Sequence, residues 1–239
     1  DLHSRVRRQR QMCISDRSIA ITDSANLFGF LKFYKSVRSK GIKPIAGAEI
    51  NHVRDSSSHN EHANLTLIAK NHLGYKNLIK LISKSQIAGK TSGIPVIETE
   101  WLAENSDGLI ALSGGFRGHI GKAVLDTNHD LFLKRIKYFQ KIFKEDFILE
   151  ISRINRPQED LYNDYILSKA GELGLPVVAS NEVRFIDKED YEAHETRVCI
   201  QKGEVLSDTR RTKGYFEDQY FLSPEEMYEK FKDIPEVLS

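Results

Sequence analysis

Short apolar runs that end in a carboxylate or carry one recur along this chain, and they constrain its fold more than any other feature. The run 18–23 (SIAITD) is followed closely by 42–49 (IKPIAGAE), and a third run spans 64–71. The runs 147–151 and 176–182 each carry a further carboxylate. Buried parallel strands deliver such residues to the carboxyl edge of an α/β sheet or barrel, where ligands bind. The runs therefore predict an α/β fold whose acids gather at one edge.

Helical patterns alternate with these runs. Apolar residues at helical spacing, or segments that suit a helix, occupy 27–37, 75–82, 118–126, 129–143 and 162–173. Such spacing is typical of helices that bury one face. Strand and helix in alternation predict a parallel sheet covered by helices.

Local end signals sharpen these expectations. Gly41 and Gly174 follow helical patterns and are expected to end them. Ser223 precedes Pro224 and two glutamates, which predicts an N-cap with proline at the first helical position. Residues 51–62 form a polar, serine-rich stretch, which we expect to be a loop between two strands. We do not expect its histidines to form a metal site, because ligands need fixed geometry and support.

Composition excludes several classes of protein. The chain has 239 residues, a net charge of +1, 40% apolar residues and 29% charged residues, which is ordinary for a globular domain. No apolar run approaches the roughly 20 residues of a membrane span, and no secretory signal is evident. The near-neutral charge argues against a uniformly basic nucleic-acid-binding domain but leaves local basic patches open. Cys13 and Cys199 suggest no disulfide framework, which fits a reducing cytoplasm and predicts a cytoplasmic protein without a membrane partner.

Several stretches are specific enough to compare with a known family. They are 21–23, 26–29, 32–34, 41–47 with Glu49, 65–78, 108–115, 149–150, 156–157, 174–179 and 181–186 followed by His194. In this order they resemble the N-terminal PHP (polymerase and histidinol phosphatase) domain of bacterial DNA polymerase III alpha subunits, of the gammaproteobacterial type. The resemblance implies a distorted (β/α)7-like barrel of about seven strands. It also implies that residues 18–239 are a PHP domain that stops before the polymerase region.

PHP domains that hydrolyse phosphoesters resemble one another in a cluster of His, Asp and Glu ligands around two or three metal ions, which make a hydroxide and clamp the reacting oxygens. Placed on that pattern, five positions keep a side chain able to bind metal, and they are Asp23, Glu49, Glu150, Glu182 and His194. Three expected histidines are instead Asn64, Ile154 and Arg184. The resemblance therefore predicts vestigial ligand positions, no metal, and no catalytic or cofactor-binding residue in this chain.

Arg184 is the most informative of these replacements, because arginine is a permanent cation. Clustered carboxylates without a cation repel one another, and one of them is forced to protonate. We therefore expect Arg184 to pair with Glu182, Asp23 or Glu49 and to replace the metal as the neutralising charge. An active metal-dependent phosphoesterase is the alternative interpretation of the surviving acids.

Residues 1–17 match the family poorly. The family begins with two histidines one residue apart, whereas His3 is followed by Ser4 and Arg5. The segment 5–17 has no clear helical stripe. A divergent arm and a sequence error upstream of Ser18 both explain this, and the residues alone do not decide between them.

The resemblance also implies a function. The parent protein is a DNA-directed DNA polymerase, a nucleotidyltransferase of DNA replication, whose Mg²⁺ ions are held by aspartates of a palm region outside this chain. In this group the PHP domain is a structural platform that docks the proofreading 3′–5′ exonuclease subunit. The expected partners are therefore that exonuclease, other replicase subunits, and DNA through the parent polymerase. A free-standing PHP phosphatase is a further alternative.

Overall fold

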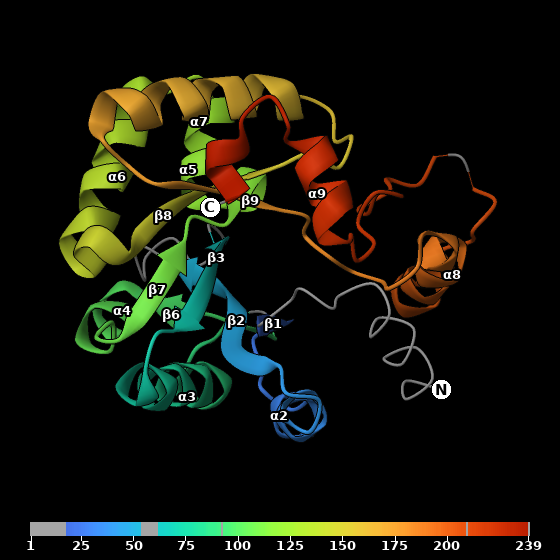
Figure 1. Cartoon of the computed structure of the whole chain (residues 1–239), viewed down its shortest axis with the longest axis horizontal. Helices are drawn as coiled ribbons and strands as arrows, with labels where there is room; N and C mark the ends of the chain where they lie inside the picture. The colour runs from blue at the N-terminus through green and yellow to red at the C-terminus, as the bar shows by residue number, and fades with distance from the viewer. Residues whose placement is uncertain (1–17, 54–61, 92, 209, 239) are drawn as a thin grey trace. The chain divides into compact units, whose positions relative to one another are not determined.

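The computed structural model describes residues 18–53, 62–91, 93–208 and 210–238 (Figure 1). Residues 1–17, on which the expectation of a poorly matching arm falls, lie outside them. The chain divides into two compact units. Among the described residues, unit 1 comprises 151–164 and 178–238, and unit 2 comprises 18–150 and 165–177, each without the gaps given above.

Strands and helices alternate through most of the chain. The strands are β1 (Ser18–Ser24), β2 (Lys43–Val53), β3 (His62–Ala69), β4 (Lys90–Thr91), β5 (Ile94–Pro95), β6 (Ile97–Glu98), β7 (Leu109–Leu112), β8 (Phe147–Ser152) and β9 (Val177–Ser180). The α-helices are α2 (Phe30–Arg38), α3 (His72–Ile87), α4 (Thr99–Glu104), α5 (His119–Leu125), α6 (His129–Phe143), α7 (Glu159–Leu173), α8 (Tyr191–Lys202) and α9 (Pro224–Lys230). Single 3₁₀ turns lie at Gly115–Arg117, Lys144–Asp146, Lys188–Asp190 and Pro235–Leu238.

A seven-stranded sheet organises the fold, in the order β1-β2-β3-β7-β8-β9 with β6 beside β2. Its strand number and its alternation with helices confirm the predicted α/β class. The expectation of an all-parallel sheet is wrong, because β3 runs antiparallel to both β2 and β7. Only eight residues separate β2 from β3. A parallel crossover needs about a dozen or more, so the shorter connection allows only antiparallel pairing.

This pairing also corrects the expected loop over 51–62. β2 continues to Val53 and β3 begins at His62, with Asn51 opposite Asn64 and Val53 opposite His62. His52 is therefore a strand residue, and it is fully buried. Its ring packs edge-on to His119 at 5.1 Å and lies 5.6 Å from Phe139. His59 lies outside the described residues.

Local signals set most helix ends as expected. α6 occupies the predicted span 129–143. Ser223 caps α9 in a capping box with Glu226, and Pro224 takes the first position. Gly174 follows α7 directly with φ of +64°, a conformation that glycine adopts at little cost. Gly41 does not cap α2, because that helix already ends at Arg38 with Ser39 as its cap.

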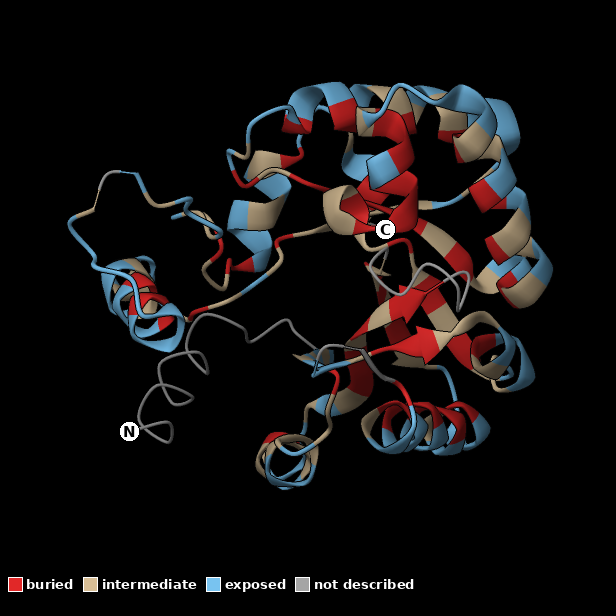
Figure 2. Ribbon diagram, turned by 180° about the vertical axis from the view of Figure 1, so that it is seen from behind, coloured by how far each residue is buried: buried red, intermediate tan, exposed pale blue. Residues whose placement is uncertain are grey.

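The core of unit 2 lies between the sheet and its helices. Buried residues concentrate on the strands and on the helix faces turned toward them (Figure 2). Leu65 and Leu67 of β3 and Leu78 and Leu81 of α3 have no exposed surface. Burial of such side chains contributes about 1.5–3 kcal/mol each. Among the described helices, none combines the length and apolarity needed to span a bilayer.

Gly74 provides a test of this packing. An added Cβ at Gly74 of α3 would lie 1.8 Å from the carbonyl oxygen of Gly108, so the two backbones approach too closely for a side chain. We expect Gly74→Ala to destabilise the chain by about 1–3 kcal/mol or more, because backbone must move. Chemical unfolding followed by circular dichroism measures this.

Gly171 of α7 is the matched control, because a Cβ there meets nothing within 4 Å. Gly171→Ala should stabilise by about 0.5–1 kcal/mol through helix propensity. Equal unfolding midpoints for the two variants would contradict the close approach at Gly74.

Candidate functional site

The register of unit 2 separates Asp23 from Glu49. Asp23 pairs with Ala48, and Glu49 pairs with Ser24. Side chains alternate between the faces of a sheet, and register partners share a face. Asp23 and Glu49 therefore project from opposite faces, although the sequence placed both at one edge. A Cβ on Gly29, in the turn before α2, would lie 3.0 Å from Asp23 Oδ2. Burial raises the pKa of the Asp23 carboxyl above its ordinary value.

Glu49 lies next to Asn64, which the sequence analysis singled out as a replaced histidine. The Asn64 side-chain amide donates a hydrogen bond to Glu49 Oε1 over 2.6 Å. The reversed direction of β3 produces this contact, because its first residues lie at the edge where parallel strands end. One carboxylate oxygen of Glu49 thus accepts a hydrogen bond from a neutral amide. An amide nitrogen that donates in this way is no metal ligand.

Glu150 lies within β8, and Ile154 lies just beyond its end. Glu150 is buried, and its backbone N–H donates to Ser113 Oγ at 3.0 Å. Ile154 is fully buried and offers no ligand atom where a histidine was expected. Its backbone N–H donates to Glu159 Oε2 at 2.7 Å. Burial raises the pKa of the Glu159 carboxyl, and the hydrogen bonds from Ser152 and Ile154 oppose that rise.

Glu182 in unit 1 has a partner that sequence reasoning missed. Arg156 donates two hydrogen bonds to its carboxylate, Nη1 to Oε1 at 2.9 Å and Nη2 to Oε2 at 2.8 Å. Only 7% of the Arg156 side chain and 12% of the Glu182 side chain are exposed. Such a bidentate pair is strong because it is both charged and planar. The stretch Arg156–Pro157 already belonged to the family resemblance, but nothing local linked it to Glu182.

The backbone at Glu182 is held in a costly conformation. Its φ is +43°, in the left-handed region that residues other than glycine and asparagine rarely adopt. Gln219 Nε2 donates to the Glu182 carbonyl at 3.0 Å, and the Arg184 N–H donates to the Gln219 carbonyl at 2.8 Å. The Arg156 pair and this exchange with Gln219 together fix the turn. The expected pairing of Arg184 with a carboxylate stays a prediction.

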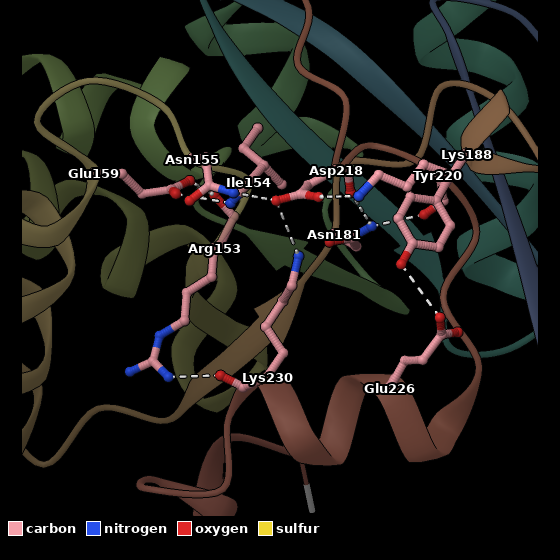
Figure 3. A network of polar contacts seen from close by, with 11 residues as sticks. Arg153, Ile154, Asn155, Glu159, Asn181, Lys188, Asp218, Tyr220, Glu226 and Lys230 are labelled. Carbon is pink, nitrogen blue, oxygen red and sulfur yellow. Dashed lines mark hydrogen bonds and ion pairs between the residues drawn. The ribbon is translucent and has the colours of Figure 1, made fainter. Parts of the chain in front are cut away.

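A polar network surrounds this turn (Figure 3). The Asn181 amide donates to the carbonyls of Asp218 and Tyr220 at 2.8 and 2.7 Å. The Asp218 carboxylate accepts a hydrogen bond from Asn155 and lies 3.8 Å from Lys230 Nζ. Burial lowers the pKa of the Lys230 ammonium, and Asp218 opposes that fall. The network ties the segments that follow β8 and β9 to residues 218–230.

His194 lies on α8 within an aromatic environment. Its ring is edge-on to Tyr215 at 4.6 Å and lies 5.6 Å from Phe185. Burial, then repulsion from Arg197 and Arg184, lowers the pKa of the imidazole, while Glu195 opposes the shift. Its Nε2 is buried without a hydrogen-bond partner. These surroundings favour the neutral ring.

The described side chains do not fit a centre of two or three metal ions. Throughout 18–53, 62–91, 93–208 and 210–238, no group of three or more His, Cys, Asp or Glu residues is placed to hold a metal ion. Glu49 accepts a hydrogen bond from Asn64, and Glu182 is paired with Arg156. The absence of bound metal nevertheless stays a prediction, to be settled by measurement.

Comparison with known proteins identifies the family of this chain. The PHP domain family model matches residues 10–154. The chain belongs to the PHP domain family. This confirms the resemblance on which the sequence analysis relied, and with it the fold class.

The PHP domain is similar to part of several much longer proteins. It is 45% identical to the DNA polymerase III alpha subunit of Vibrio cholerae and 43% identical to that of Escherichia coli K12, each over 222 residues and 93% of this chain. Identity to the Haemophilus influenzae subunit is 40% over 228 residues, or 95% of the chain. The chain spans about a fifth of the length of these relatives, 19–20%.

A solved structure shows a weaker similarity. It is a candidate metal-dependent phosphoesterase from Bifidobacterium adolescentis, 12% identical with a TM-score of 0.49, covering 74% of this chain and 80% of that one. Similarity at this level carries no argument about the PHP domain.

The Arg156–Glu182 pair yields a stability prediction. Arg156→Met leaves a largely buried carboxylate without its cation, so we expect a loss of about 3–5 kcal/mol in chemical unfolding. The double variant Arg156→Met with Glu182→Leu should recover much of that loss. Lys202→Met, on an exposed residue of α8, is the control. A loss of stability in Arg156→Met as small as that in the control would contradict the pair's role.

Arg184→Met, measured in the same series, tests the prediction that Arg184 replaces the metal as the neutralising charge. That prediction requires a clear fall in melting temperature.

His194 yields a pH prediction. A histidine whose pKa is lowered by folding resists protonation in the folded state. The stability that the neutral His194 ring contributes is fully present above the unfolded-state pKa of about 6.5. It is lost as the pH falls through the lower folded-state pKa. His194→Gln should therefore reduce the decline of unfolding free energy as pH falls below about 6.5. Thr196→Ala, a non-titrating exposed site on α8, should keep the original decline, and a His194→Gln profile equal to it would rule out this role.

Proposed function

We propose that this PHP domain is part of a replicative DNA polymerase alpha subunit and lacks phosphoesterase activity. Its role is to act as a structural platform and to dock the proofreading 3′–5′ exonuclease subunit. DNA and the other replicase subunits are then reached through the parent polymerase in the cytoplasm. Polymerase chemistry with Mg²⁺ belongs to a palm region, and no residue of this chain is assigned to it.

One observation supports the proposed lack of phosphoesterase activity. The guanidinium of Arg156 pairs with the largely buried carboxylate of Glu182. Metal-binding carboxylates need their oxygens free for the metal, whereas a bidentate guanidinium uses both. The Asn64–Glu49 hydrogen bond supports the same conclusion at a second position. Ile154 removes a third ligand by offering only hydrocarbon.

Sequence similarity to polymerase subunits and the low net charge both support the docking role. Relatives of 40–45% identity are named as DNA polymerase III alpha subunits. A net charge of +1 gives little overall counterion release, so duplex DNA should bind weakly at physiological salt. A specific protein interface needs about 800 Å² per partner, which a domain of this size can provide.

A three-part experiment tests the proposal on the 239-residue chain. The chain is titrated with the cognate proofreading exonuclease and, separately, with primed duplex DNA at physiological ionic strength. Elemental analysis after exhaustive dialysis measures zinc, manganese and iron, and a chromogenic phosphodiester measures hydrolysis. We expect saturable exonuclease binding, weak DNA binding, no stoichiometric metal and no hydrolysis.

Each alternative predicts a different result. Two equivalents of metal with metal-dependent hydrolysis of the phosphodiester or of primed DNA would establish an active phosphoesterase. Hydrolysis of small phosphomonoesters without exonuclease binding would indicate a free-standing PHP phosphatase. As a matched control for hydrolysis, Glu182→Gln should be as inactive as the unchanged chain, since it restores no ligand.

A further inference from the structure

Positive charge is segregated in the sequence of unit 2. Residues 24–48 contain five Lys or Arg residues and no Asp or Glu, and residues 62–97 contain five more and again no acid. The first segment forms α2 and the second forms α3. The two helices lie next to each other on the same side of the sheet (Figures 1 and 2), and the ring centroids of Phe30 of α2 and Tyr75 of α3 are 5.5 Å apart.

A cavity of about 640 Å³ opens between these helices. Its lining includes the rings of Phe30, Tyr34 and Tyr75. It also includes aliphatic side chains from three strands, namely Ile45, Ile68 and Ile110. Lys43 and Lys70 line its rim. A mostly apolar lining with a few charged groups is the usual form of a binding site for an apolar group.

Within unit 2, the cavity is separate from the contact between Glu49 and Asn64. Ile45 lies near the start of β2, and Ala69 is the last residue of β3. Glu49 and Asn64 lie toward the other ends of these antiparallel strands, past the pairing of Gly47 with Ile68. No vestigial ligand position lines the cavity.

The surface around the cavity mixes exposed apolar and basic side chains. Phe28 is 91% exposed, Leu31 is 63% exposed and Leu73 is 53% exposed. Leu31 follows Phe30 and Leu73 follows His72 in the sequence, and both of these neighbours line the cavity. Single exposed apolar residues are unremarkable, but several near a cavity mark an interaction surface. Lys32 and Lys76 are exposed as well. Lys70 Nζ pairs with Asp146 Oδ1 at 2.8 Å.

We propose that this surface binds a segment of a partner protein that presents an apolar side chain between carboxylates. The apolar side chain would occupy the cavity, and the carboxylates would meet the lysines of α2 and α3. Charge complementarity of this kind speeds encounter and selects the partner. The proposal does not rest on the proposed function, because it concerns the surface around this cavity and names no particular subunit.

The arrangement of the rings favours protein over nucleic acid. Binding of single strands needs open aromatic faces on which bases stack. Here Phe30 contacts Tyr34 at 6.0 Å and Tyr75 at 5.5 Å, and the Arg38 guanidinium lies over the Tyr34 ring at 5.7 Å. The rings therefore contact one another and a cation. The aliphatic residues that line the cavity likewise suit an apolar side chain.

Selection from a random peptide library, displayed on phage, tests the proposal with the 239-residue chain as target. Enriched peptides should share an aromatic or aliphatic residue flanked by Asp or Glu. Their affinity is then measured by fluorescence anisotropy against the chain and against two variants. One carries Lys32→Glu, Lys35→Glu and Lys76→Glu, and the other carries Leu31→Ser and Leu73→Ser. All five positions are exposed, so both variants should fold, which circular dichroism verifies.

We expect each variant to bind the enriched peptides about tenfold or more weakly, and only the charge variant to lose the salt dependence of binding. The matched control reverses Lys134, Lys137 and Lys141, three exposed lysines of α6, and should bind as the unchanged chain does. Enrichment without acids, or affinities unchanged by either variant, would overturn the proposal. So would displacement of the peptides by oligo(dT) at equal concentration, because it would assign the surface to nucleic acid.

Discussion

The antiparallel pairing of β2 with β3 is the constraint on which the rest of unit 2 depends. It extends from Gly47 opposite Ile68 to Val53 opposite His62. Because the two strands run in opposite directions, the start of β3 meets the far part of β2, and the end of β3 meets its start. The first meeting places Asn64 on Glu49. The second brings α2 and α3, which flank these strands in sequence, around one cavity.

In unit 1, a buried carboxylate is neutralised by an arginine. A carboxylate that loses its metal must be protonated, exposed or paired. Glu182 is paired, and the guanidinium of Arg156 is both buried and bidentate. This pair also supports a backbone conformation that glutamate rarely adopts. The ion pair and the hydrogen bonds of Asn181 and Gln219 thus hold the same turn.

Net charge proves a poor guide to the surface of this PHP domain. A value of +1 conceals two acid-free segments that fold next to one another. The acids that balance them lie elsewhere in the chain, for example Glu225, Glu226 and Glu229 of α9. Electrostatic recognition depends on local distribution within a Debye length of roughly 8–10 Å, so the sum over the chain says little about any one surface.

The sequence by itself determined the elements and the family. The span of α6 and the cap of α9 are local, since each depends on residues within a few positions. The apolar runs likewise located the principal strands, and the motifs identified a PHP domain.

Only tertiary structure decided how these elements combine. It set the direction of β3, the opposite faces of Asp23 and Glu49, and the choice of Arg156 as the partner of Glu182. Side chains alternate with a period of two, so a shift of one residue in register moves a carboxylate to the other face. An ion pair between residues 26 positions apart likewise depends on how distant segments pack, which no local pattern encodes.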